Sequence, residues 1–148
     1  MHYEGSFEVS APKEKVYAFI TDLRQLTGIF PDVSDVKIID NDNSTLKAKV
    51  GISFIKGTMD VRLSIVEKDP FSLMKLKARG AGLGSTVDLD GTFTLEGNRG
   101  TTVKWAVDVK IGGMIANVGS RLVDTLADTY MKQVISTFQG KLSQETYW

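Results

Sequence analysis

Residue types that commonly carry out catalysis are scarce in this chain. It has no cysteine and a single histidine, His2, which follows the initiator Met. Nucleophilic triads need a base beside the nucleophile, and thiolate metal sites need cysteine. The sequence therefore predicts no catalytic residue, no metal site and no cofactor.

Two tyrosines are the remaining candidates for chemistry. Tyr17 and Tyr130 fall on apolar faces of predicted helices, so each phenol could reach an internal cavity as a hydrogen-bond donor or a general acid. Tyrosines in such positions more often belong to the core, with the hydroxyl at its edge. Asp60, Asp88 and Asp90 alternate with apolar residues, which places them on the solvent side of a sheet. An enzyme of the cyclase or hydrolase kind, using Tyr17 or Tyr130, stays open as an alternative.

A glycine-rich stretch, Gly80–Gly84, could be mistaken for a phosphate loop. It lacks the Gly-Lys-Ser/Thr ending of such loops and lies between predicted strands, so the match is accidental. The pattern favours an ordinary hairpin loop here, and the alternative is a mobile rim of a ligand site.

Composition and charge exclude several classes of protein. The 148 residues include 18 basic and 18 acidic ones, and a chain without net positive charge is a poor candidate for binding nucleic acid. No apolar run approaches the ~20 residues of a membrane span, although peripheral membrane contact is still allowed. The N-terminus has acidic residues and no apolar core of a signal peptide. We therefore expect one cytoplasmic domain over residues 1–148.

The residues that would position a site belong first to a long predicted helix, Gly113–Leu142. Its apolar side chains recur every three or four residues, as on one face of a helix. At ~1.5 Å per residue this helix would be roughly 45 Å long, and it needs a sheet to lie against. The apolar positions are Ile115, Val118, Leu122, Leu126, Tyr130, Val134 and Phe138, and the face is widened by Met114, Val123, Met131 and Ile135.

Before this helix the apolar period changes to two, which is typical of half-buried strands. His2–Ser10 is a predicted strand, followed by two short helices that end by Gly28. Six strands then follow, with a tight hairpin predicted at Lys56–Gly57. Their predicted ranges are Val33–Ile39, Leu46–Phe54, Met59–Ile65, Met74–Gly80, Val87–Leu95 and Val103–Ile111.

Short turns between successive strands favour an antiparallel meander. The predicted fold is α+β: a curved antiparallel sheet of about seven strands wrapped around the long C-terminal helix. The outward side chains agree with this pairing, because Lys75, Lys77 and Arg79 on one strand could face Asp88 and Asp90 on the next.

A curved sheet around one helix leaves a space between them, and small-ligand sites of this kind are lined mostly by apolar side chains. Any single lining residue could equally be filling a core. The predicted ligand-binding residues are Leu26, Phe30, Phe54, Met59, Leu63, Met74, Phe93, Trp105, Leu122, Leu126 and Tyr130.

Several short motifs point to a known family. They include Glu4-Gly5-Ser6-Phe7, the Phe30-Pro31 turn, Lys56-Gly57-Thr58, Gly112-Gly113-Met114-Ile115-Ala116 and Gly119-Ser120-Arg121-Leu122. With the order of elements, they resemble the START-like (Bet v 1-like, SRPBCC) helix-grip superfamily. Within it the chain is similar to the CoxG family, named after the G subunit of carbon monoxide dehydrogenase. One departure is Pro31-Asp32, where that family commonly has Pro-Gly.

The resemblance implies a hydrophobic cavity between sheet and helix, and a protein accessory to a molybdenum-containing carbon monoxide dehydrogenase. We therefore expect a non-catalytic binding protein for a lipid, an isoprenoid or a quinone-like compound. A third interpretation is a protein-docking assembly factor that uses the long helix or the Tyr147-Trp148 tail.

Overall fold

One strand, two short helices and six further strands precede the C-terminal helix. The computed structural model describes residues 1–145, with side chains as far as Ser143. The elements are β1 (His2–Val9), α1 (Lys13–Ile20), α2 (Leu23–Thr27), β2 (Val33–Ile38), β3 (Asn43–Ile52), β4 (Ile55–Asp69), β5 (Leu73–Gly82), β6 (Ser85–Glu96), β7 (Thr101–Gly113), the 3-10 helix η1 (Met114–Val118) and α3 (Ser120–Glu145).

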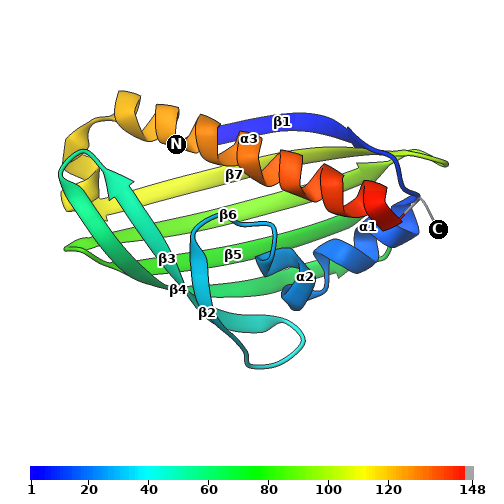
Figure 1. Ribbon diagram of the computed structural model, residues 1–148, viewed down its shortest axis with the longest axis horizontal. Helices are drawn as coiled ribbons and strands as arrows, with labels where there is room; N and C mark the ends of the chain where they lie inside the picture. The colour runs from blue at the N-terminus through cyan, green and yellow to red at the C-terminus, as the bar shows by residue number, and fades with distance from the viewer. Residues whose placement is uncertain (146–148) are drawn as a thin grey trace.

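The strands form one sheet in the order β1-β7-β6-β5-β4-β3-β2, with every neighbouring pair antiparallel. The first strand therefore pairs with the last, and the six later strands form a meander. Figure 1 shows α3 crossing one face of the sheet, with α1 and α2 near the C-terminal end of this helix. The predicted α+β helix-grip architecture is confirmed.

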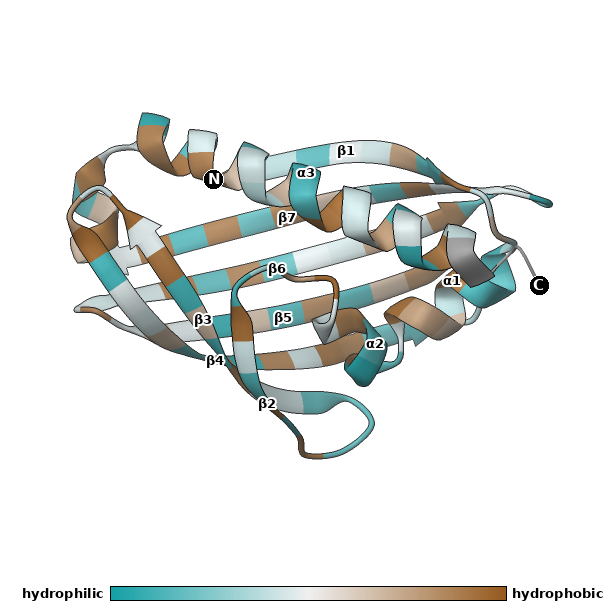
Figure 2. Ribbon diagram, in the orientation of Figure 1, coloured by the Kyte–Doolittle hydropathy of each residue, from teal (hydrophilic) through white to brown (hydrophobic). Residues whose placement is uncertain are grey.

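Strand register agrees with the predicted charge pairing on the outer face for two of the three basic residues, whereas Lys75 lies opposite Thr92 and its ammonium is 3.8 Å from Glu67 on β4. Lys77 lies opposite Asp90 and Arg79 opposite Asp88, with ion-pair distances of 3.5 and 2.8 Å. Because all four side chains are solvent-exposed to a large degree, each pair contributes only ~0–1 kcal/mol. Apolar and polar residues alternate along the strands (Figure 2), which gives the sheet one apolar and one polar face.

Two hairpin turns differ in how well the sequence predicts them. The glycine-rich stretch is an ordinary tight turn, since Leu83 and Gly84 have φ of 55° and 64° and link β5 directly to β6. The hairpin predicted at Lys56–Gly57 is wrong: the turn is at Ser53–Phe54, where Ser53 has φ 55°. Ile52 and Ile55 are both buried and pair across this turn, which fixes it three residues earlier.

The C-terminal helix is shorter than predicted at its N-terminal end. Strand β7 continues to Gly113, η1 occupies Met114–Val118, and α3 begins at Ser120. Gly113 and Gly119 have φ of 83° and 96°, a region that glycine enters without the penalty of a Cβ. The apolar spacing runs on across this interruption, which is why the sequence predicts one continuous helix from Gly113.

Candidate functional site

The buried apolar side chains form two separate clusters. The larger one joins α1, α2 and the C-terminal half of α3 to the sheet, and its helix residues include Val134, Phe138 and Leu142. The smaller one joins the β3–β4 turn to η1 and the start of α3, through Ile52, Ile55, Met59, Ile115 and Val123.

Three large, partly buried apolar residues of β6 and β7 belong to neither cluster. They are Leu89 on β6 and Trp105 and Val107 on β7. We call these three residues the middle of the inner face. They lie along β6 and β7 between residues of the larger cluster and residues of the smaller one.

The predicted lining residues fall into three groups. Leu26, Met59, Leu63 and Met74 are buried in the two clusters. Phe30, Phe93, Trp105 and Tyr130 are partly buried. The third group, Phe54, Leu122 and Leu126, is exposed.

The three residues of this third group were predicted to face inward, and their exposure corrects that prediction in two parts of the fold. Phe54 is 76% exposed because it lies in the β3–β4 turn and not on the inner face of a strand. Leu122 and Leu126 are 47% and 42% exposed, because Val123 is the side chain that α3 buries near its start. At the N-terminal end of the helix, the buried residue is thus one from the margin of the predicted apolar face and not one from its centre.

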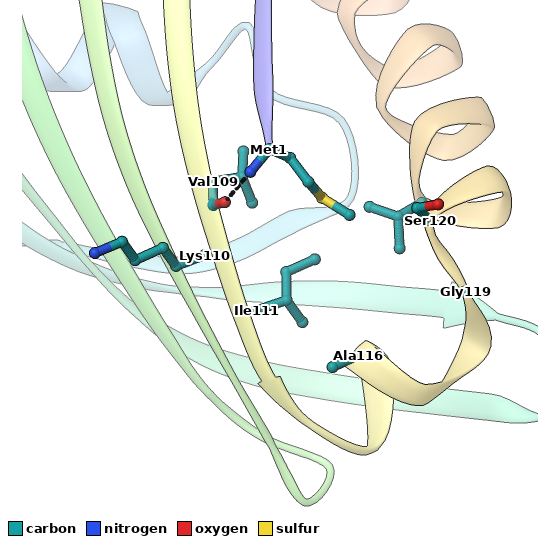
Figure 3. Close-up of a pocket in the computed structure, with 8 residues that line it drawn as sticks. Met1, Val109, Lys110, Ile111, Ala116, Gly119 and Ser120 are labelled. Carbon is teal, nitrogen blue, oxygen red and sulfur yellow. Dashed lines mark hydrogen bonds between the residues drawn. The ribbon is translucent and has the colours of Figure 1, made fainter.

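A pocket of about 530 Å³ opens between the end of β7 and the start of α3 (Figure 3). None of the predicted lining residues contributes to it. The opening lies where Gly119 separates η1 from α3, an interruption that the prediction of one continuous helix did not include. The lining residues are Met1, Val109, Lys110, Ile111, Ala116, Gly119, Ser120 and Val123.

Trp105 occupies the inner face directly opposite Gly5 on β1 and Phe93 on β6. A Cβ on Gly5 would lie 2.9 Å from Trp105 Cζ2 and 3.0 Å from Nε1, so the indole fits only because Gly5 has no side chain. Trp105 Nε1 is buried and has no hydrogen-bond partner. Among the described residues, no other buried side-chain nitrogen or oxygen lacks a hydrogen-bond partner.

Two tyrosines on or beside α3 have raised pKa values. Burial, with a smaller contribution from Asp32, raises the pKa of Tyr130 to about 12. Burial and the hydrogen bond from its hydroxyl to Asp124 Oδ1, 2.6 Å long, raise the pKa of Tyr3 to about 12. Both phenols are therefore neutral donors at neutral pH. Tyr17 lies elsewhere, with its ring edge-on to Phe71 at 5.6 Å.

The described part of the chain was also searched for metal-binding clusters and for membrane-spanning helices. Residues 1–145 contain no cluster of three or more histidine, cysteine or acidic side chains that could hold a metal ion. Within the same residues, no helix combines the length and apolarity needed to cross a bilayer.

A seven-stranded antiparallel sheet with a long C-terminal helix across one face defines a protein of the START-like helix-grip class. The model of the CoxG family, the G subunit of carbon monoxide dehydrogenase, matches residues 5–143, so the chain belongs to that family. Membership of this family suggests a ligand-binding role and a link to carbon monoxide dehydrogenase.

Solved structures of the same fold are found in several bacteria. A conserved protein from Geobacillus kaustophilus superposes with a TM-score of 0.88 at 20% identity, covering 97% of this chain and 96% of that chain. The Zhui aromatase/cyclase from Streptomyces sp. R1128 gives 0.72 at 14% identity, covering 99% and 95%. A START superfamily protein from Mycobacterium smegmatis gives 0.70 at 14% identity, covering 97% of each chain. At these identities the likeness concerns the fold alone. No curated protein matches the chain.

Proposed function

We propose that the protein binds a hydrophobic small molecule, such as a lipid, an isoprenoid or a quinone-like compound, between the sheet and α3 without transforming it. It would serve as an accessory factor of a carbon monoxide dehydrogenase-type molybdenum enzyme. The proposal places this binding in the cytoplasm, with peripheral membrane contact allowed.

One observation carries the proposal. Leu89, Trp105 and Val107 are apolar, only partly buried, and lie on the inner face between the two core clusters without belonging to either. At about 25 cal/mol per Å² of apolar area removed from water, a ligand that covers large side chains gains several kcal/mol. The exposed Leu126 and the partly buried Tyr130 lie on the helix that would close over such a ligand.

A carrier fits the available side chains better than an enzyme does. A general acid works best with a pKa near the operating pH, whereas burial raises the pKa of Tyr130 to about 12. Tyr17 packs on Phe71, away from the middle of the inner face. Neither of the two tyrosines named for the cyclase or hydrolase alternative is therefore well suited to act as its general acid.

Native mass spectrometry of protein purified without detergent tests the proposal. The expected result is a stoichiometric lipophilic adduct, which solvent extraction would release for identification. A clean apo mass that a panel of lipids and quinones fails to shift would contradict it. The docking-factor interpretation would then lead. Its Tyr147-Trp148 part lies outside the described residues.

A pair of tryptophan substitutions on β5 locates the bound molecule. Ala78 is partly buried on the inner face and Ala81 is exposed on the outer face of the same strand. Ala78→Trp should fill the binding space and abolish the adduct, whereas Ala81→Trp should leave it intact. Equal adduct levels in both folded variants would move the binding site away from this face.

A further inference from the structure

The indole N–H of Trp105 is a hydrogen-bond donor without an acceptor. Nε1 is buried and unpartnered in the structure. Leaving such a donor unsatisfied costs free energy, and a buried group of this kind in a folded protein calls for an explanation. A phenylalanine would pack over Gly5 without that cost, so the nitrogen is what needs explaining.

A bound water is a poor explanation for this donor. A buried water needs two to four polar partners. The side chains that lie opposite Trp105 in the sheet are Gly5 and Phe93, and neither offers a polar group. The strand neighbours therefore supply no side-chain partner for the indole, and a bound molecule whose remaining surface suits apolar neighbours can supply one.

Trp105 also lies at the place where the proposed ligand would sit. It belongs to the middle of the inner face, between the two core clusters. On the neighbouring strand β1, Tyr3 on one side of Gly5 bonds Asp124, and Phe7 on the other side stacks edge-on against Phe138 at 5.5 Å. The indole thus lies beside the stretch of β1 between these two contacts with α3.

We propose that Trp105 Nε1–H is the polar anchor of the ligand site. It donates a hydrogen bond to an uncharged acceptor oxygen, such as a carbonyl, on an otherwise apolar ligand. This inference rests on the proposed function and narrows its ligand class: pure hydrocarbons are excluded as preferred ligands.

The cover over Nε1 has to move for the acceptor to reach it. In its N-terminal half, α3 buries Val123 and leaves Leu122 and Leu126 exposed. In its C-terminal half it buries Val134, Phe138 and Leu142. The N-terminal half therefore has the fewer buried side chains to displace if α3 moves to admit a ligand.

A matched pair of probes isolates the hydrogen bond. Octanophenone and octylbenzene have the same shape and differ by one carbonyl in place of a CH₂. A site that hydrogen-bonds its ligand discriminates strongly against an analogue that lacks the polar atom. Octanophenone should bind the wild-type protein about tenfold more tightly than octylbenzene, and Trp105→Phe should remove that preference by weakening octanophenone alone.

A spectroscopic measurement on the wild-type protein supports the same test without relying on a variant. The chain has two tryptophans, Trp105 and Trp148, so ¹⁵N-labelled protein gives two indole cross-peaks, and Trp105→Phe assigns them. Octanophenone should shift the Trp105 N–H proton downfield, and octylbenzene should not.

Two control substitutions show whether the ketone preference depends on Trp105 or on another hydrogen-bond donor. Tyr3→Phe removes a hydroxyl that is already bonded to Asp124, so it should leave the ketone preference unchanged. Tyr130→Phe removes a hydroxyl that has no hydrogen-bond partner among the described residues. If Tyr130→Phe abolishes the preference and Trp105→Phe does not, the anchor is Tyr130 and the inference is overturned.

The test also separates this inference from the proposed function. Equal affinity for both probes, with no downfield shift at Trp105, would overturn the polar anchor and leave an apolar binding protein. A protein that binds neither probe would contradict the proposed function and this inference together.

Discussion

Tyr3 on β1 and Asp124 on α3 are joined by a hydrogen bond of 2.6 Å between the phenol and Oδ1. It links the sheet edge to the N-terminal half of the helix. Near the other end of α3, Gln139 Nε2 donates to the Glu8 carbonyl at 2.8 Å, again on β1. The helix is therefore fastened to the same strand at two points, and only the second lies beside a well-buried part of the helix.

Tyr3→Phe is expected to loosen the start of α3 more than it lowers global stability. The bond is exposed, so its loss should cost at most about 1 kcal/mol of unfolding free energy. Amide hydrogen exchange over residues 120–127 should become faster, while exchange over residues 134–142 stays unchanged.

Thr102→Val is the matched control for this substitution. Thr102 Oγ1 donates to Glu8 at 2.7 Å within the sheet and does not involve α3. It should leave exchange at the start of the helix unaffected. Equal acceleration in both variants would mean that the Tyr3–Asp124 bond has no special role there.

His2 is expected to titrate above its ordinary pKa of 6.5, chiefly because its ring is hydrogen-bonded to Asp108 at 2.7 Å. Since the folded state holds the proton more tightly, the interaction stabilises the fold fully below pH 6.5 and is lost as pH rises through the raised pKa. An NMR titration of the His2 ring measures this directly. Asp108→Asn should return the pKa towards 6.5, and Glu4→Gln should lower it less. An unchanged pKa in Asp108→Asn would refute the assignment.

The strands and the meander of the six later ones follow from the sequence because a two-residue apolar period with short turns leaves few alternatives, whereas the pairing of β1 with β7 was not predicted. Pairing of Lys77 with Asp90 and of Arg79 with Asp88 was predictable for the same reason. The turn at Ser53–Phe54 was not, because Lys-Gly resembles a hairpin turn and Phe54 continues the apolar alternation. Only the burial of Ile52 and Ile55 against η1 and α3 distinguishes the two registers.

The start of the helix was missed for a related reason. Apolar spacing reports which residues share a face, but it does not report whether the backbone is interrupted between them. Gly119, with φ 96°, turns the chain between η1 and α3 and shifts the buried position to Val123. The unpartnered Nε1 of Trp105 also lies beyond sequence reasoning, since hydrogen-bond satisfaction depends on contacts between strands and helix.

Leucine truncations along α3 should separate its anchored half from its loosely held half. Leu142 is 0% exposed in the larger cluster, whereas Leu126 is 42% exposed. Leu142→Ala should cost about 2–5 kcal/mol of unfolding free energy, as other buried leucines do. Leu126→Ala removes the same atoms from the same helix and should cost less than about 1 kcal/mol. Urea denaturation measures both, and similar losses would contradict the division of α3 into two halves.

Gly5→Ala should disturb the indole of Trp105, because a Cβ at that position would lie 2.9 Å from Cζ2. Relief of the clash needs the ring or the strand to move, so we expect a loss of about 1–3 kcal/mol and a changed environment of the Trp105 indole cross-peak. Gly51→Ala on β3 is the control, since no atom lies within 4 Å of its Cβ position. Alanine at that position lowers the conformational entropy of the unfolded chain, so the free energy of unfolding should be unchanged or slightly higher. If Gly5→Ala behaves like Gly51→Ala in urea denaturation and leaves the indole signal in place, the indole does not depend on Gly5 for its position. The placement of Trp105 as a fixed donor on the inner face would then have to be abandoned.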